Sequence, residues 1–347
     1  MKILVIGNMG YVGPSVVKEL RSSFPSGELV GIDTGFFSHL LTGSDRLPES
    51  FLSKQLFMDA RNIPDEVFIG VDAVVYLAAV SNDPMGKKFE KATYDINYEA
   101  CIDVAKKAKV HGVGKFVFAS SCSVYGFAEE GARTEDSEVN PLTAYAKSKV
   151  MAEEVLVSLS EKVFEVTCLR FATACGMSDR LRLDLVLNDF VAGAITSNRI
   201  NILSDGSPLR PLIHVRDMAR AINWAISRSK QEGGDSLVVN VGSNDWNYQV
   251  RELAEAVAQH CVGTSVTINK DALPDRRSYR VNFDLFNSLA PDYQPQFSLE
   301  DTIEDIKRGL VSMSFDDPLY HKSSLIRLNV LEEMIARKRI SNELHWI

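Results

Sequence analysis

The sequence predicts an α/β protein built on a doubly wound parallel sheet, with a smaller lobe in its C-terminal half. Continuous apolar runs of strand length alternate with segments of helical period over about the first 170 residues. This pattern is typical of parallel strands covered by helices on both faces. The first apolar run leads directly into a glycine-rich turn, GNMGYVG. After about residue 172 the pattern loosens into shorter elements that are richer in polar and basic residues.

The expected elements follow one another along the chain. The predicted strands are 2–7, 28–33, 54–59, 73–79, 115–120 and 163–171, and the helices between them are about 12–22, 93–110 and 143–159. Further helices are expected near 183–196, 215–229, 247–260 and 299–310. These elements predict a first domain of residues 1–172, to which segments near 200–245 return, a lobe of residues 173–315 and an amphipathic helical extension of residues 316–347.

The composition indicates a small-molecule partner. The chain has 347 residues, a net charge of -8 and no run of Lys or Arg, so neither nucleic acid nor an anionic membrane surface is an expected partner. No apolar run approaches the ~18 residues of a membrane span. The five cysteines are odd in number and include no CxxC pair, which predicts a reducing, cytoplasmic location and no metal site.

The glycine-rich turn predicts a dinucleotide site. Gly7, Gly10 and Gly13 are spaced GxxGxxG between the first strand and the first helix. A bare backbone and a helix N-terminus can bind a pyrophosphate there, so these glycines, together with Tyr11 and Val12, are candidate cofactor-binding residues. The alternative interpretation is ordinary turn chemistry.

The ends of the next strands support the same hypothesis. Asp33 ends the second strand, where a carboxylate can accept hydrogen bonds from both ribose hydroxyls of NAD and repel the 2′-phosphate of NADP. NAD is therefore the predicted cofactor. Asp59 could accept a hydrogen bond from the adenine amino group, and a solvated loop acid is the alternative. Residues that would let a cofactor lie across the sheet edge are Ala60, Leu77, Ala78 and Ala79.

The segment TAYAKSK contains a candidate catalytic pair. Tyr145 and Lys149 are spaced YxxxK, so their side chains share one face of the expected helix. An ammonium near a phenol lowers the pKa of the phenol, which would make Tyr145 a base near neutral pH. Upstream, the strand end FASSCSVYG places three hydroxyls and a thiol together.

In their order and spacing these motifs resemble the extended short-chain dehydrogenase/reductase family, in its nucleotide-sugar epimerase/dehydratase branch, over about residues 1–312. The resemblance implies a Rossmann-like sheet with a C-terminal substrate-binding lobe. It also implies that Ser121 hydrogen-bonds the reacting sugar hydroxyl, that Tyr145 is the base, and that Lys149 holds the tyrosine charge and the nicotinamide ribose. Asn97 matches the family's asparagine on the helix beneath the site.

Two residues of the strand end distinguish possible reactions. The family's 4,6-dehydratases carry Asp and Glu after the Ser/Thr, whereas this chain has Cys122 and Ser123. The usual acid and base for loss of water are therefore missing, which argues against simple dehydration. Cys122 is either an acid/base, as in related reductase-epimerases, or a small wall residue. The favoured reaction is 4-epimerisation, in which a C4 hydride passes to NAD and returns to the other face of a 4-keto sugar.

The second lobe contains candidates for binding a nucleotide diphosphate. By the resemblance, Asn188 and Arg210 contact the diphosphate, and Arg180 and Arg182 lie just before Asn188. A guanidinium suits such a role through its planar fork of donors. Arg277, in PDRRSYRV, is the candidate for a late phosphate-binding arginine, with a solvated basic loop as the alternative.

Two other functions stay open. One is an NAD-dependent C4 dehydrogenase or 4-ketosugar reductase, because RLRLDL resembles family members that oxidise C4 of GDP-linked heptoses. The other is a non-catalytic dinucleotide sensor, which the presence of both Tyr145 and Lys149 argues against. The resemblance further implies a homodimer through the helices near 93–110 and 143–159, and it ends before the extension of residues 316–347.

Overall fold

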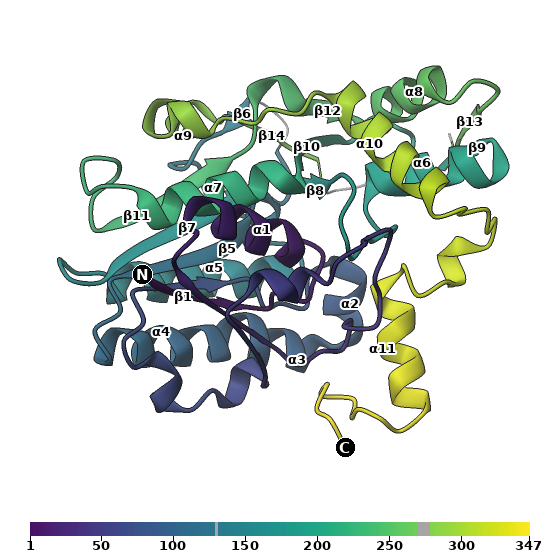
Figure 1. Cartoon of the computed structure of the whole chain (residues 1–347). Coiled ribbons are helices and arrows are strands. Elements are labelled where there is room, and N and C mark those ends of the chain that lie inside the picture. Colours follow the sequence, from purple (N-terminus) through teal and green to yellow (C-terminus); the bar gives the residue numbers. More distant parts are fainter. Residues whose placement is uncertain (129–130, 270–271, 273–277) are drawn as a thin grey trace.

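A seven-stranded parallel sheet forms the centre of the protein (Figure 1). The computed structural model describes residues 1–128, 131–269, 272 and 278–347. The strand order is β11-β7-β5-β4-β1-β2-β3, and every pairing is parallel. The strands are β1 (Lys2–Ile6), β2 (Glu28–Asp33), β3 (Lys54–Phe57), β4 (Ala73–Tyr76), β5 (Lys115–Ser121), β7 (Glu165–Phe171) and β11 (Ser236–Val241). The predicted Rossmann-like fold class is confirmed.

Helices cover both faces of this sheet because its strands are apolar on both sides. In β1, Ile3 and Val5 pack into one buried cluster, whereas Leu4 and Ile6 pack into another. On the first face α1 packs against α7, and on the second α4 packs against α5. The helices of this layer are α1 (Gly13–Ser23), α2 (Asp83–Lys88), α3 (Glu90–Tyr94), α4 (Ala100–Val110), α5 (Ala144–Leu159), α7 (Val215–Ser227) and α9 (Asp284–Leu289).

The expected helix of residues 93–110 is interrupted. A π-helical turn, Asp95–Glu99, separates α3 from α4. Such turns are frequent at functional sites. This one places Asn97 inside the protein, where it is fully buried.

The second lobe is built from small sheets and three longer helices, which gather around their own buried cluster (Figure 1). The strands are β6 (Ala132–Arg133), β8 (Thr173–Cys175), β9 (Arg199–Ile202), β10 (Leu209–His214), β12 (Asn247–Gln249), β13 (Ser265–Ile268) and β14 (Arg280–Val281). The helices are α6 (Val186–Ser197), α8 (Val250–His260) and α10 (Leu299–Ser312). No helix in the described part of the chain is long and apolar enough to cross a membrane.

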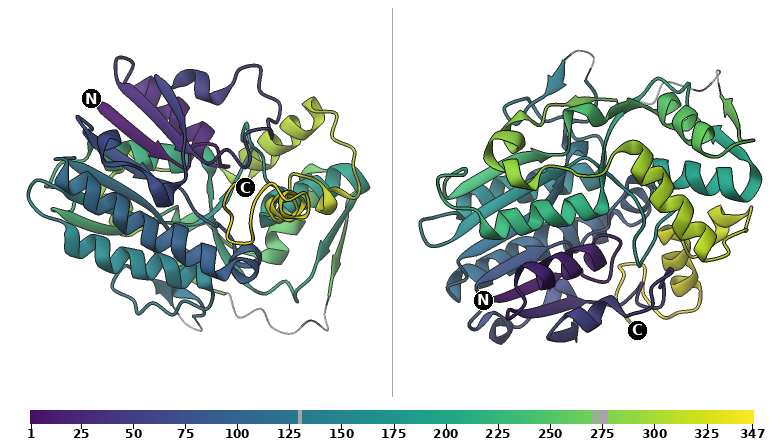
Figure 2. Two further views of the ribbon diagram at one scale, coloured as in Figure 1. Left: turned by 90° about the horizontal axis from the view of Figure 1, so that it is seen from below. Right: turned by 45° about the horizontal axis from the view of Figure 1, so that its top comes forward.

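The C-terminal segment, residues 316–347, leaves the second lobe and returns to the first domain (Figure 2). Its helix α11 (Arg327–Ala336) packs in a buried cluster with Phe36, Met85 and Phe89. Beyond the helix, the Trp346 indole donates to the Thr34 carbonyl oxygen at 2.9 Å. The Arg61 guanidinium donates to the carbonyl oxygens of residues 343 and 344 at 2.8 and 2.6 Å. The segment therefore lies beside the loop that follows β2.

Candidate active site

A cavity of about 560 Å³ lies at the carboxyl ends of β1, β4 and β5, between the sheet and the second lobe. The strand order reverses between β1 and β4, and ligands bind at such switch points in doubly wound sheets. The glycine-rich turn, α5, the second lobe and the C-terminal segment all contribute to its wall. Within the described residues, no group of His, Cys, Asp and Glu is arranged to hold a metal ion.

The glycine-rich turn forms one end of the cavity, where Gly7, Gly10, Tyr11, Val12 and Gly13 all lie in its wall. A Cβ on Gly7 would meet the Ala78 backbone nitrogen at 2.4 Å, and Gly7 has a positive φ of 90°. A Cβ on Gly13 would lie 1.9 Å from the Asn8 carbonyl oxygen. A Cβ on Gly10 would meet only the Gly7 oxygen, at 3.6 Å. Gly7 and Gly13 are thus required by packing, whereas Gly10 leaves open space towards the cavity.

Matched alanine substitutions test this division. Gly13→Ala is expected to lower the free energy of unfolding by about 3 kcal/mol, because the backbone of Asn8 must move to admit the methyl group. Gly10→Ala is expected to unfold at the wild-type temperature and to bind NAD more weakly. Thermal unfolding and calorimetric NAD titration measure both quantities. Equal loss of stability in the two variants would show that Gly10 is also needed for packing.

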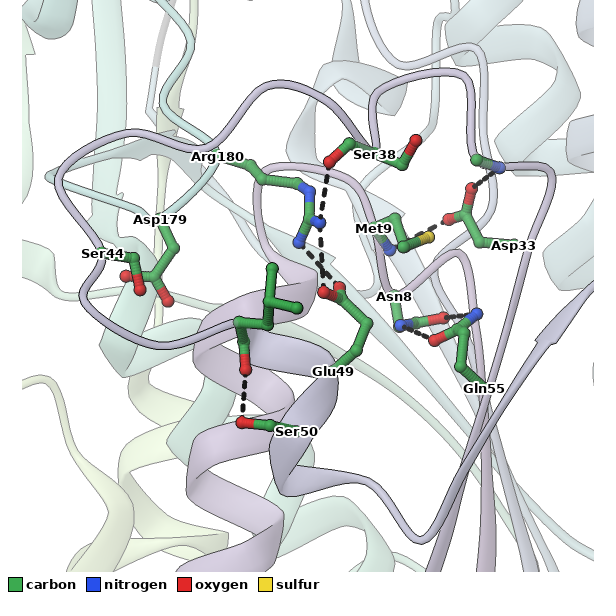
Figure 3. A network of polar contacts seen from close by, with 12 residues as sticks. Asn8, Met9, Asp33, Ser38, Ser44, Glu49, Ser50, Gln55, Asp179 and Arg180 are labelled. Atoms are coloured by element: carbon green, nitrogen blue, oxygen red, sulfur yellow. Dashed lines mark hydrogen bonds and ion pairs between the residues drawn. The ribbon is translucent and has the colours of Figure 1, made fainter.

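Asp33 is held in place by backbone donors. Its carboxylate accepts hydrogen bonds from the Met9 and Gly35 amides at 3.0 and 2.8 Å (Figure 3). Burial raises the pKa of Asp33, and these two amides oppose the rise. The fixed carboxylate faces the cavity at the end of β2, where it can accept from a ribose.

The other residues predicted on the cofactor side also line the cavity: Asp59, Ala60, Leu77, Ala78 and Ala79. Burial would raise the pKa of Asp59, but hydrogen bonds from Arg61 outweigh it and the pKa is lowered. The Arg61 guanidinium binds both carboxylate oxygens and also reaches the C-terminal segment. Asp59 therefore links that segment to the cavity wall.

Tyr145, Lys149 and Ser121 meet inside the cavity. The Tyr145 hydroxyl is hydrogen-bonded with Ser121, and the Lys149 ammonium donates to the Ala119 carbonyl oxygen at 2.7 Å. Burial lowers the pKa of Lys149 to about 8. Burial also raises the pKa of Tyr145 to about 12, although the hydrogen bond with Ser121 opposes the rise.

This differs from the expectation that Lys149 lowers the pKa of Tyr145. The Lys149 nitrogen lies 5.8 Å from the centre of the Tyr145 ring and is directed to a backbone oxygen instead. Burial of the phenol therefore dominates. A positive charge beside the phenol, such as an oxidised nicotinamide ring carries, would lower its pKa.

The hydroxyl-rich strand end has two sides. Ser121 and Ser123 face the cavity, and the Ser123 hydroxyl is buried without a hydrogen-bond partner among the described residues. Cys122 turns into the apolar core, where its thiol donates to the Arg170 carbonyl oxygen at 3.1 Å. Burial raises the pKa of the Cys122 thiol. The structure therefore contradicts an acid/base role for Cys122, because its side chain does not reach the cavity.

Alanine substitutions at these two positions should have opposite effects. Ser123→Ala removes the hydroxyl of a cavity-wall residue that has no hydrogen-bond partner among the described residues, and the expected result is about a tenfold rise in KM with unchanged thermal stability. Cys122→Ala should lower the unfolding temperature and keep the wild-type KM, because it leaves a small void in the core. Steady-state kinetics and thermal unfolding of both variants check this. A tenfold loss of turnover in Cys122→Ala alone would reverse the assignment.

Asn97 lies behind the cavity wall. Its amide accepts from the Val80 amide at 2.8 Å and donates to the Val80 carbonyl and to Ser148 at 3.1 Å each. It therefore fixes the end of β4 to the helix that carries Tyr145 and Lys149. The prediction that Asn97 binds the cofactor is not supported, because its polar atoms are used inside the protein.

Two residues predicted to bind the nucleotide also lie behind the wall. Asn188 is fully buried, and its amide binds the Gly176 amide, the Tyr11 hydroxyl and the carbonyl oxygen of residue 182. Arg180 pairs with Glu49 at 2.7 Å, which anchors the loop after β2 (Figure 3). Both residues stabilise the elements around the cavity and do not line it.

Arg182 and Arg210 do reach the cavity. Arg182 binds the Asp184 carboxylate at 2.8 Å and the Ser81 hydroxyl at 2.7 Å. Arg210 extends from β10 on the second lobe. Arg277 lies outside the described residues.

The wall residues that were not predicted from the sequence include Asp83, Asp184, Tyr279 and Arg327. Asp83 accepts a hydrogen bond from the Thr143 hydroxyl at 2.7 Å, and its charge contributes to the raised pKa of Tyr145. Its position just after the fourth strand is a signal that could have identified it. Arg327 belongs to the C-terminal segment, whose sequence carries none of the motifs that mark the rest of the site.

The residues present fit a dinucleotide. Helix α1 begins without a side-chain cap, so its first backbone N–H groups are available at the cavity end where Gly10 leaves space. Asp33 supplies a fixed acceptor at the ribose position. Lys149 and Tyr145 line the same cavity.

The chain is similar to known proteins in sequence and in fold. The model of the NAD dependent epimerase/dehydratase family matches residues 3–242. A UDP-glucose 4-epimerase from Corynebacterium glutamicum is 25% identical over 273 residues, which are 74% of this chain and 79% of that protein. A UDP-glucose 4-epimerase from Lactobacillus helveticus is 27% identical over 282 residues, 74% of this chain and 82% of that protein.

A solved structure is similar over a longer span. The NAD dependent NDP-hexosamine 5,6-dehydratase involved in tunicamycin biosynthesis superposes with a TM-score of 0.77 at 23% identity. The similarity covers 91% of this chain and 99% of that one. It shows a shared fold, while the matched family region ends before the C-terminal segment.

Proposed function

The chain belongs to the NAD dependent epimerase/dehydratase family, and on that premise we propose that it is a nucleotide-sugar 4-epimerase that oxidises C4 transiently. NAD is the cofactor of this family of enzymes. The observation that carries the proposal is the group formed by Tyr145, Ser121 and Lys149 in the cavity, with no carboxylate at positions 122 and 123. The relatives named UDP-glucose 4-epimerase support it.

The chain's own residues hold the sugar and move its proton. Ser121 donates to or accepts from the C4 hydroxyl and orients it towards Tyr145. Tyr145 removes the hydroxyl proton and later returns it to the C4 oxygen of the keto sugar. Lys149 fixes this helix face to the end of β5 and holds the cofactor ribose. NAD, when bound, supplies the hydride acceptor and donor.

We further propose which ligand each part of the chain binds. Residues 1–172, with the returning segments near 200–245, bind NAD, and residues 173–315 bind the nucleotide sugar. Arg182 and Arg210 hold the sugar-nucleotide diphosphate, since both reach the cavity from the second-lobe side. A homodimer through α4 and α5 and a cytoplasmic location remain predictions.

Dehydration is the less favoured reaction. Of the carboxylates in the cavity wall, Asp33 and Asp59 lie at the predicted cofactor positions. Asp83 and Asp184 are hydrogen-bonded to Thr143 and to Arg182 respectively. A net C4 dehydrogenase would use the same Tyr145 and Lys149, so product analysis has to separate it from an epimerase.

The proposal is tested by incubating the purified protein with UDP-glucose and, separately, with UDP-galactose. An epimerase converts each sugar into the other and reaches the same mixture from both sides, as read by chromatography or NMR. The GDP-, CDP- and dTDP-linked sugars follow as a panel. Formation of a 4-keto or 4,6-dehydrated product at the expense of both sugars would contradict the proposal.

A further inference from the structure

Arg327 is a buried cation in the wall of the cavity. It is the first residue of α11, its side chain is 1% exposed, and it lines the cavity. One guanidinium nitrogen, Nη2, donates to the Arg180 carbonyl oxygen at 2.8 Å, and the guanidinium lies 4.8 Å from the centre of the Phe37 ring. The other terminal nitrogen, Nη1, has no hydrogen-bond partner among the described residues.

The neighbouring arginines are neutralised, whereas Arg327 is not. Arg180 pairs with Glu49 and Arg182 pairs with Asp184. Within the described part of the chain, no carboxylate forms an ion pair with Arg327. Burial and the positive charge of Arg182 together lower the pKa of Arg327 to about 9, against the opposing charge of Asp184. A buried guanidinium of this kind is stabilised by an anion that comes from outside the chain.

The position of Arg327 indicates which anion. Its ring neighbour Phe37 follows Asp33 by four residues. Arg180, whose carbonyl oxygen Arg327 binds, comes two residues after Ser178, and the Ser178 hydroxyl donates to the Tyr11 carbonyl oxygen at 2.6 Å. Phe37 and Tyr11 both line the cavity, and Tyr11 belongs to the glycine-rich turn. The uncapped N-terminus of α1 begins two residues after Tyr11. A helix N-terminus and a guanidinium both bind phosphate groups, and the diphosphate of a dinucleotide is the anion expected beside a glycine-rich turn.

We propose that Arg327 binds the diphosphate of the dinucleotide cofactor, so that the C-terminal segment completes the cofactor site. The matched family region ends at residue 242, so this contact lies outside it. The segment is held in place by the Arg61 and Trp346 hydrogen bonds and by the ion pair of Lys88 with Glu332 at 2.8 Å. The proposal depends on NAD binding and is independent of the sugar reaction.

The test compares nucleotides that differ in phosphate. Arg327→Met and Arg327→Lys are titrated calorimetrically with NAD, ADP, adenosine and UDP, beside Arg337→Met as the control on the exposed end of α11. Removing a charge-assisted contact should weaken the binding of NAD and ADP about tenfold to a hundredfold. The affinities for adenosine and UDP should stay unchanged. Arg327→Lys keeps the positive charge but not the planar fork of donors, so its affinity for NAD and ADP should fall less than that of Arg327→Met. Pyrophosphate alone should raise the unfolding temperature of the wild type more than that of Arg327→Met.

Several outcomes would overturn the proposal. NAD and ADP affinities within twofold of wild type would show that Arg327 does not contact the diphosphate. Weaker UDP binding alone would assign it to the sugar nucleotide. An equal loss of affinity for adenosine and for ADP would mean that Arg327 has a structural role. If Arg327→Met does not fold, the ratio of ADP to adenosine affinity in Arg327→Lys decides between these results.

Discussion

Replacing Tyr145 by phenylalanine is expected to lower sugar turnover about 10³-fold while the fold and bound NAD stay as in the wild type. The hydroxyl is the group that meets Ser121 inside the cavity, and the ring itself is retained. Turnover should therefore fall without a change in unfolding temperature. The measurement is kcat for interconversion of UDP-glucose and UDP-galactose, together with the NAD content per chain.

A matched control uses another tyrosine of the same domain. Tyr94→Phe, at the end of α3, removes a hydroxyl that does not line the cavity and should keep wild-type turnover. Because the pKa of Tyr145 is raised to about 12, the phenolate form increases with pH, and wild-type turnover limited by proton removal should rise between pH 6 and 9. Turnover of Tyr145→Phe within tenfold of wild type would remove Tyr145 as the base.

Lys149→Met is expected to lower turnover at least about 10²-fold and to raise stability at pH 7. The lysine is 2% exposed, and its ammonium has one hydrogen bond, to the Ala119 carbonyl oxygen. Burial lowers the pKa of the folded protein's Lys149 to about 8, against 10.5 for the ordinary side chain. This difference corresponds to up to about 3 kcal/mol of unfolding free energy that the charged lysine costs below pH 8.

The sign of the pH effect follows from proton binding. Between about pH 8 and 10.5 the unfolded chain keeps the lysine proton that the folded chain has released, so this group makes stability increase with pH. Lys149→Met should lack that increase, whereas Lys147→Met, an exposed position on the same helix, should keep it. Chemical unfolding at pH 7 and pH 9.5 measures the difference. A large loss of stability at pH 7 in Lys149→Met would contradict the claim that the buried Lys149 charge destabilises the folded protein.

Local motifs explain why part of the site could be predicted from sequence. The glycine-rich turn and Asp33 each follow a strand, and the carboxyl ends of parallel strands meet at one edge of the sheet. The YxxxK spacing places Tyr145 and Lys149 on one helix face. These residues lie together in the cavity because each signal is contained in a few consecutive positions.

Other assignments depended on partners far away in the chain. Arg180 is 131 residues from its partner Glu49, and Asn188 is 177 residues from the Tyr11 hydroxyl it binds. Nothing near these positions in the sequence distinguishes a residue in the cavity wall from one just behind it. Neither alternative for Cys122, an acid/base or a small wall residue, agrees with the structure, because its side chain packs in the apolar core while its neighbours Ser121 and Ser123 line the cavity. The π-helical turn at Asn97 likewise has no periodic signal.

The measurement that tests the central claim most directly uses a sugar nucleotide labelled with deuterium at C4. If the hydride leaves C4 and returns to it within one turnover, UDP-[4-²H]glucose should give UDP-galactose that keeps the deuterium at C4, with no lasting increase in NADH absorbance. Loss of the label to solvent, or NADH that accumulates in proportion to the sugar consumed, would contradict a 4-epimerase.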